Sequence, residues 1–177
     1  MHMVSQQRLI NEASKDLKEL LAKPDWAEYV RTGVSRQRPP LDEDWWYVRA
    51  AAILRVIYFR GPIGVSKLRT KYGGVKNRGV GPGAFFKGSG SVIRKILQQM
   101  DEAGLIQSAE RGVHKGRMVT SKGASLLFAA SKRVAAADKK ASGGSSKKQE
   151  KPSEKKGSGK KAAEKDSSKE GSAGKKE

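Results

Sequence analysis

The hydrophobic positions in the first part of the chain recur at helical spacing. Apolar residues return every three or four positions until Pro24, which predicts a helix over residues 5–23. A proline is typical of the first turn of a helix, so a short second helix is predicted over residues 24–33. Residues 34–41 hold two arginines and two prolines, and we expect an extended basic linker there.

The next apolar segment is predicted to be the central helix of the fold. It follows three consecutive acids at positions 42–44, whose carboxylates favour a helix N-terminus, and it runs to Gly61. Apolar residues cover most of its circumference, so the other helices should pack around it.

Glycines then divide the chain into shorter elements. A short helix is predicted over residues 65–72 and a glycine-rich, basic loop over residues 75–90. The following helix is expected to be capped by Ser91 and to end at Gly104, which supplies the turn after its last residue.

A hairpin and a final helix complete the pattern. Two short apolar segments flank a basic, glycine-rich tip at residues 111–117, which predicts a β-hairpin. A last helix is predicted to start at Thr120 or Ser121. This order of elements is typical of a winged helix-turn-helix, in which one helix and the hairpin wing together grip a nucleic-acid backbone.

The last forty residues differ from the rest in composition. Residues 138–177 contain 13 lysines and 7 acids but no Val, Ile, Leu, Met or aromatic residue. Such a segment buries nothing that would offset the entropy of ordering, so it is predicted to be a disordered basic tail. The predicted fold class is mainly α over residues 1–137, with helices around a central helix, a winged-helix-like core and a short β-hairpin wing.

The charge pattern points to a partner. Residues 45–100 contain eleven Lys and Arg but no Asp or Glu, in a chain of net charge +19. A surface that needed only solubility would mix both signs. The acid-free segment is therefore predicted to hold a polyanion, of which a nucleic-acid backbone is the obvious biological example. The alternative is a solvated basic face without a partner.

Residues with catalytic or metal-binding chemistry are scarce. The chain has no cysteine and two histidines, His2 and His114, which excludes a thiolate zinc site and a multi-histidine site. No carboxylate pair or nucleophile arrangement is found in the acid-free segment, so we expect no enzyme and no cofactor. No apolar run approaches the roughly 20 residues of a membrane span, and we expect a soluble intracellular protein. Whether Met1 and His2 are native is left open.

Three features allow two interpretations each. Residues 88–91 can hold a phosphate at a helix N-terminus or only cap that helix. The aromatic residues 45–47 can stack on unpaired bases, although aromatics in the first turn of a central helix are more often core. The loop over residues 76–87 can mould itself to a folded RNA or remain a solvated loop.

Several motifs resemble one known family. The segments DWWYVRAAA at 44–52, LRTKYGG at 68–74 and GSGSVIRKILQQ at 88–99 are similar to the small-subunit ribosomal protein family nineteen-e of archaea and eukaryotes. PDWA at 24–27 and GRMVT at 116–120 also match its pattern. The resemblance covers roughly residues 9–134, looks more archaeal than eukaryotic, and does not include the tail.

This resemblance implies a function. Members are helical proteins with a winged-helix-like core that sit in the head of the small ribosomal subunit, bind small-subunit rRNA and are linked to subunit maturation. It implies a cytoplasmic, ribosome-bound monomer with neighbouring head proteins as further partners. The family's sensitive basic positions fall on Arg49, Arg55 and Arg94, with Trp45 at the helix start. With the charge pattern, the candidate RNA-binding residues are Trp45, Arg49, Arg55, Arg60, Arg69, Lys71, Lys76, Arg78, Lys87, Ser89, Arg94, Lys95 and Arg117.

A winged-helix DNA-binding regulator is the rival interpretation. Gln98 and Gln99 are residue types that read base edges, but no dimerisation helix is evident, and such regulators usually dimerise to match paired half-sites.

Overall fold

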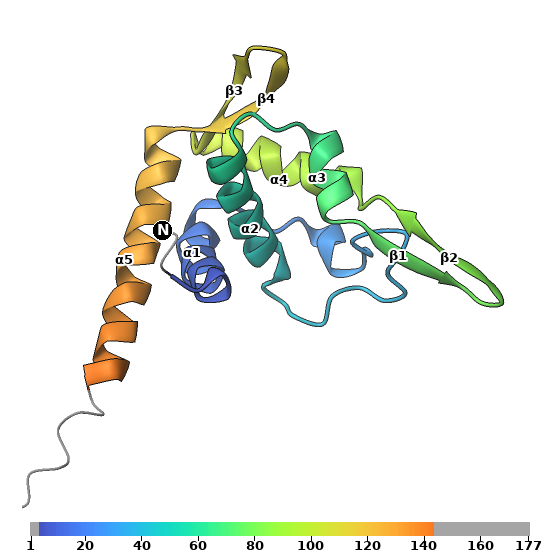
Figure 1. Ribbon diagram of the computed structural model, residues 1–177, viewed down its shortest axis with the longest axis horizontal. Helices are drawn as coiled ribbons and strands as arrows, with labels where there is room; N and C mark the ends of the chain where they lie inside the picture. The colour runs from blue at the N-terminus through green and yellow to red at the C-terminus, as the bar shows by residue number, and fades with distance from the viewer. Residues whose placement is uncertain (1–3, 144–177) are drawn as a thin grey trace, which may run out of the picture.

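The computed structural model describes residues 4–143, which form helices and two separate antiparallel hairpins (Figure 1). In chain order the elements are α1 (Gln6–Leu20), the 3-10 turn η1 (Asp25–Glu28), α2 (Trp45–Arg60), α3 (Val65–Lys71), β1 (Gly74–Arg78), β2 (Gly81–Phe86), α4 (Gly90–Glu102), β3 (Ile106–Arg111), β4 (His114–Val119) and α5 (Ser121–Gly143). The prediction of a mainly helical fold with a short hairpin wing is confirmed.

The predicted central helix is α2, and it lies in the middle of the molecule (Figure 1). α1 packs against both α2 and α5, while β4 and α5 also contact α2. Trp46, Ile53 and Leu54 of α2 are fully buried and share one core with Leu97 and other apolar residues of α4. Burial of this apolar surface is the main force that holds the helices together.

The predicted second helix is shorter than expected. Only η1 is helical, because the segment after it is held by another part of the chain. The Ser89 backbone N–H donates to the Thr32 carbonyl oxygen at 2.9 Å, and Gly33 pairs with Gly88 as an isolated antiparallel bridge. These contacts keep residues 32 and 33 extended against the start of α4.

The glycine-rich segment predicted as a loop is the hairpin β1–β2, so that prediction was wrong. Its strands pair in antiparallel register, with Val75 opposite Phe85, and Gly79 turns the chain with φ of +70°. A Cβ on Gly73 would lie 2.5 Å from the Phe86 carbonyl oxygen. Glycine there serves close approach of two backbones rather than flexibility.

The two ends of helix α4 are defined by the residues and backbone conformation found there. It starts at Gly90, with Ser89 in the capping position that was predicted for Ser91. At its other end Gly104 has φ of +69°, and the Leu105 N–H donates to the Met100 carbonyl oxygen at 2.9 Å. This is the Schellman arrangement, and the predicted role of Gly104 is confirmed.

The hairpin β3–β4 is the predicted wing, with a tip narrower than expected at Gly112 and Val113. It is anchored on the turn between α2 and α3, because the Ile63 N–H donates to the Arg117 carbonyl oxygen at 3.2 Å and the Arg117 N–H donates to the Ile63 oxygen at 3.1 Å. The wing therefore has a fixed position relative to the central helix.

Helix α5 continues beyond the predicted domain end at residue 137. Asp138 lies within the helix, and its carboxylate pairs with Arg8 of α1. The remainder of the predicted tail, residues 144–177, lies outside the described residues. Among the described helices none is long and apolar enough to cross a membrane.

We expect Gly123→Ala to lower the free energy of unfolding by about 1–3 kcal/mol, because α5 is packed tightly at this buried glycine. An added Cβ would collide with the Leu105 carbonyl oxygen and lie 2.8 Å from Val119 Cγ1. Urea denaturation followed by circular dichroism measures the change. Gly81→Ala is the control, since its Cβ would meet only ordinary contacts at 3.8 Å or more. Equal losses in the two variants would contradict the tight packing of α5.

Candidate nucleic-acid interface

The ion pairs of the described residues include no Lys or Arg of the acid-free segment, residues 45–100. Their cations are Arg8, Lys15, Lys18, Lys23, Lys115, Arg117 and Arg133. All of these lie before residue 45 or after residue 100. Within the described part of the chain, none of the eleven Lys and Arg of residues 45–100 meets a carboxylate. The positive charge of this segment is thus left uncompensated by the acids of residues 4–143.

Arg49 is the most constrained of these cations. It projects from α2 so that its guanidinium lies over the ring of Tyr72, 4.6 Å from the centroid, and much of its surface is buried. Burial lowers the pKa of Arg49, and the nearby Arg36 acts in the same direction, while Tyr72 opposes both. A cation that is buried without a carboxylate costs free energy, which an arriving anion would offset.

Tyr72 connects this cation to a second one. Burial raises the pKa of the Tyr72 phenol to about 12, against the opposing charges of Arg49 and Arg55. Its hydroxyl group is buried and has no hydrogen-bond partner among the described residues. The guanidinium of Arg55 lies 4.8 Å from the centroid of the Phe59 ring, and its buried Nε also has no partner there. The two arginines and the phenol therefore form a polar cluster whose donors are only partly used.

The cluster extends towards the end of α3. Lys71 is exposed as a whole, but its ammonium group is partly desolvated by its neighbours. This partial burial lowers the pKa of Lys71, and the charges of Arg60 and Arg55 lower it further. Arg49 and Arg55 both act on the pKa of Tyr72, while Arg55 and Arg60 act on that of Lys71. These four cations of α2 and α3 thus form one group, and no acid is among the charges that act on these pKa values. Like charges held this close favour the binding of an anion, and the effect is strongest where water is partly excluded.

The start of α4 carries a second group of cations. The Arg69 Nε–H donates to the Gly88 carbonyl oxygen at 3.1 Å, which fixes the side chain across the beginning of the helix. Arg69, Lys87 and Ser89 line a pocket of about 450 Å³ together with Arg31 and Tyr29. The exposed Arg94 and Lys95 belong to the same helix, on the side opposite its buried residues.

The hairpin β1–β2 extends away from the helices (Figure 1). Lys76 and Arg78 are exposed on β1, and the Lys76 ammonium lies 5.8 Å from the centroid of the Phe86 ring. Val75 and Phe85, which pair across the hairpin, are also exposed. The hairpin offers a partner both positive charge and apolar surface.

Trp45 does not fit the predicted stacking role. Its side chain is 7 % exposed, and its ring packs edge-to-face on Trp46 with centroids 5.5 Å apart. A base cannot stack on a ring face that is already covered, so Trp45 belongs to the core.

Arg117 braces the wing rather than facing outwards. Its guanidinium pairs with Asp101 at 3.7 Å, its buried Nε has no partner among the described residues, and both of its backbone hydrogen-bonding groups bond to Ile63. Arg117 thus has a structural role in the wing, and its contact to RNA stays a prediction.

The predicted phosphate cradle at residues 88–91 is partly occupied, because two of its four backbone N–H groups are bonded within the protein. The Gly88 N–H donates to the Arg69 carbonyl oxygen at 2.8 Å, and the Ser89 N–H donates to Thr32. The Ser89 hydroxyl shares a hydrogen bond with that of Ser91. Ser89 makes no side-chain capping hydrogen bond to α4, so a phosphate site and ordinary helix capping both stay predictions for residues 88–91.

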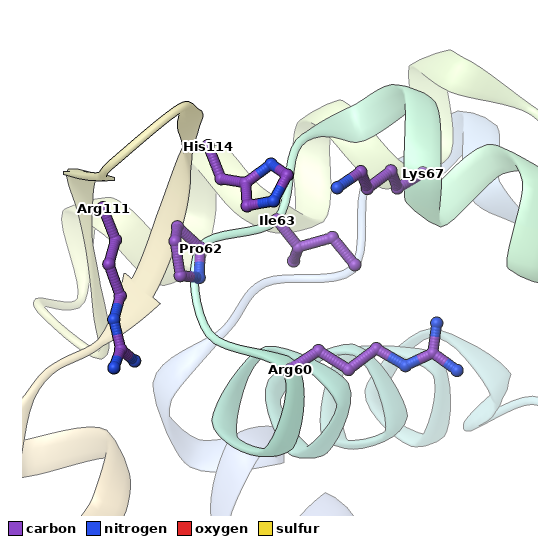
Figure 2. A pocket seen from close by; sticks show the side chains of 6 residues that line it. All are labelled: Arg60, Pro62, Ile63, Lys67, Arg111 and His114. Carbon is purple, nitrogen blue, oxygen red and sulfur yellow. The ribbon is translucent and has the colours of Figure 1, made fainter.

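Several basic or aromatic residues near these cations were missed by the sequence reasoning. Tyr29, 82 % exposed, and Arg31 border the pocket at the start of α4. Arg111 and His114 join Arg60 and Lys67 around a pocket beside the wing (Figure 2). Tyr29 and Arg31 could have been found from the sequence, because a tyrosine lies two residues before an arginine there. Arg111 and His114 could not, because their place in the pocket depends on the folded position of the wing.

Catalytic chemistry finds no support in this arrangement. Over residues 4–143 the structure contains no group of three or more His, Asp or Glu side chains that could hold a metal ion. The polar groups that gather on the surface around α2, α3 and α4 are hydrogen-bond donors with positive charge, which bind anions rather than transfer protons.

Comparison with known proteins identifies the family. The sequence model described as ribosomal protein S19e matches residues 1–137. The chain belongs to the ribosomal protein S19e family. The predicted resemblance is confirmed, and the matched residues contain every element that carries the cations described above.

Relatives in the S19e family come from archaea and from an animal. Over 130 residues the chain is 45 % identical to "Small ribosomal subunit protein eS19" of Aeropyrum pernix, which covers 71 % of this chain and 83 % of the relative. The protein of the same name from Thermoplasma acidophilum is 42 % identical over 128 residues, with the same coverage. "Small ribosomal subunit protein eS19G" of Ascaris suum is 42 % identical over 122 residues, which are 68 % of this chain and 81 % of the relative.

Proposed function

We propose that this protein is a non-enzymatic structural constituent of the small ribosomal subunit that works on the ribosome in the cytoplasm. It binds small-subunit rRNA in the subunit head as a monomer, lies beside neighbouring head proteins and supports subunit assembly. The observation that carries the proposal is the set of eleven cations in residues 45–100, none of which pairs with a carboxylate of the described part of the chain. Family membership and the names of the relatives support the same conclusion.

The arrangement suits a folded RNA. Its cations come from three helices, α2, α3 and α4, and from the projecting hairpin β1–β2 with the segment after it, so they lie on differently shaped parts of the surface. Arg49 and Arg69 are held in place by Tyr72 and by the Gly88 carbonyl. Rigid donors of this kind match the spacing of phosphates and recognise backbone shape rather than base sequence.

The rival function, a DNA-binding regulator, is disfavoured by the state of Gln99, one of the two glutamines on α4; the other, Gln98, is exposed. The Gln99 side chain donates to the Ala22 carbonyl oxygen at 2.6 Å and accepts the Trp46 Nε1–H at 3.1 Å. Its amide is therefore bonded within the protein, which leaves Gln98 alone of the two glutamines free to read a base edge. A helix that reads DNA in the major groove presents several such side chains together.

A sucrose gradient of cell lysate separates the two functions. We expect the tagged protein to sediment with small ribosomal subunits and to remain there after DNase treatment. Recovery on chromatin, with none on small subunits, would reverse the assignment in favour of the DNA-binding regulator.

We expect Arg94→Ala to weaken binding to small-subunit rRNA by on the order of 1–3 kcal/mol, because a charge-assisted contact to phosphate is removed. Arg94 is exposed on a rigid helix and has no acidic neighbour to release. Fluorescence anisotropy with a labelled head fragment of the rRNA measures the change. Lys132→Ala is the control, since Lys132 is an exposed cation of α5. If the two variants lose the same affinity, the protein binds through its net charge and the α4 surface has no special part.

A further inference from the structure

A pocket of about 520 Å³ lies between the tip of the wing and the turn from α2 to α3 (Figure 2). Arg60 is the last residue of α2, and Lys67 belongs to α3. Arg111 and His114 are paired residues of β3 and β4 at the wing tip. Pro62 and Ile63 of the turn complete the lining, which contains no acid. Three separate elements therefore bring basic side chains to one hollow.

The side chains are arranged around an apolar floor. Figure 2 shows Lys67 and His114 pointing towards one another, with Ile63 between and below them, and Arg60 extending along the opposite side. Arg111 lies on the far side of Pro62 in this view. Ile63 is 3 % exposed. Cations around a concave, partly apolar surface concentrate positive potential, which raises the affinity for an anion.

The wing is held firmly in the position that forms this pocket. Besides the two backbone hydrogen bonds between Ile63 and Arg117, Gly116 packs directly on the turn. A Cβ on Gly116 would lie 2.5 Å from the Ile63 backbone nitrogen. Because the turn and β4 are in direct backbone contact, the pocket is formed before any ligand arrives, which lowers the cost of ordering on binding.

We propose that this pocket binds one phosphodiester group of the RNA backbone. Lys67 and His114 would donate to the phosphate oxygens from two sides, with Arg60 and Arg111 supplying further positive charge. The proposal rests on the proposed rRNA-binding function and adds to it a contact on the wing side. The wing then serves as a clamp on the backbone, and Arg60 connects this contact to the cations around Tyr72.

The first test removes charge from the pocket. The double variant Lys67→Gln/Arg111→Gln is compared with Lys15→Gln/Lys132→Gln, which loses the same charge from α1 and α5. Binding of a labelled head fragment of the rRNA is measured over a range of salt concentrations. We expect the pocket variant to lose about tenfold in affinity and to lower the slope of log K against log salt by about 1, because one phosphate contact is lost. The control pair should lose much less in both.

The second test moves the wing without removing a charge. Gly116→Ala forces β4 away from Ile63, so we expect its RNA affinity to fall as in the pocket variant. A circular dichroism melt establishes whether the variant folds. If it does not, the charge variant alone decides. A folded Gly116→Ala that binds RNA like the wild type would contradict the need for a docked wing.

The outcomes separate the two proposals. If the wild-type protein has no affinity for small-subunit rRNA, the proposed function itself is contradicted. A wild type that binds, with equal affinity and equal salt slopes for the pocket and control pairs, would remove only the pocket. Inorganic phosphate is then titrated into the protein while the amide NMR signals of Lys67 and His114 are followed. If these signals shift but the pocket variant binds RNA like the wild type, the pocket takes free phosphate only, and the pocket proposal is again removed.

Discussion

Trp46→Ala is expected to lower the free energy of unfolding by about 3–5 kcal/mol, the usual range for a large buried aromatic. Trp46 is fully buried in α2. Its ring packs edge-to-face with Trp26 at 5.6 Å and with Trp45 at 5.5 Å between centroids. Its Nε1–H donates to Gln99 of α4. The substitution therefore leaves a cavity, breaks two aromatic contacts and leaves the Gln99 carbonyl oxygen without its donor.

Urea denaturation followed by far-ultraviolet circular dichroism measures this loss. Two variants divide it into parts. Trp46→Phe keeps a ring in the core and should lose only about 1–2 kcal/mol, since it removes the hydrogen bond and part of the volume. Trp26→Ala should also lose less, because Trp26 is 36 % exposed. A Trp46→Ala variant that is as stable as Trp26→Ala would show that the core is not centred on Trp46.

The same tryptophan illustrates how well the helices were predicted from the sequence. Apolar residues on most sides of one segment identified α2 as the central helix, because only a helix surrounded by others can bury such a surface. The glycine after α4 and the basic tip of the wing were also recognised from residue types that particular turns require. These features depend on residues that are close together in the sequence, so they can be recognised from the sequence alone.

The hairpin β1–β2 was missed for a physical reason. A strand is recognised when buried and exposed side chains alternate, but Val75 and Phe85 are both exposed and β1 has no fully buried residue. Its glycines are needed where backbones approach each other, yet in the sequence they are typical of a loop. Nothing in the sequence distinguishes these two uses of glycine.

The candidate site was predicted as a charge pattern but not as a geometry. The absence of acids from residues 45–100 correctly located cations without carboxylate partners. The pocket between Lys67 and His114 was not predictable, because those residues are far apart in sequence and meet only when the wing docks on the α2–α3 turn. Trp45 and Arg117 were placed in the site by motif and charge, but the packing of Trp45 on Trp46 and the ion pair of Arg117 with Asp101 appear only in the folded structure.

Arg49→Met is expected to weaken RNA binding without a comparable loss of stability. Affinity for small-subunit rRNA should fall by on the order of 1–3 kcal/mol, because a rigid cation is lost from the cluster around Tyr72. The free energy of unfolding should stay within about 1 kcal/mol of the wild type or rise above it. Methionine is of similar length and removes a cation that burial disfavours, as the lowered pKa of Arg49 indicates. The lost contact with the Tyr72 ring offsets part of that gain.

Arg133→Met is the matched control for this prediction. Arg133 of α5 pairs with Glu12 and Asp16 of α1, so its positive charge is already compensated within the protein. We expect a small loss of stability, about 0.2–1 kcal/mol for an exposed pair, and little change in RNA affinity. If Arg49→Met instead loses more stability than Arg133→Met while both bind RNA equally, Arg49 is a structural residue of α2. If Arg49→Met weakens only RNA binding, a cation is kept at this buried position because the anion that compensates it belongs to the RNA.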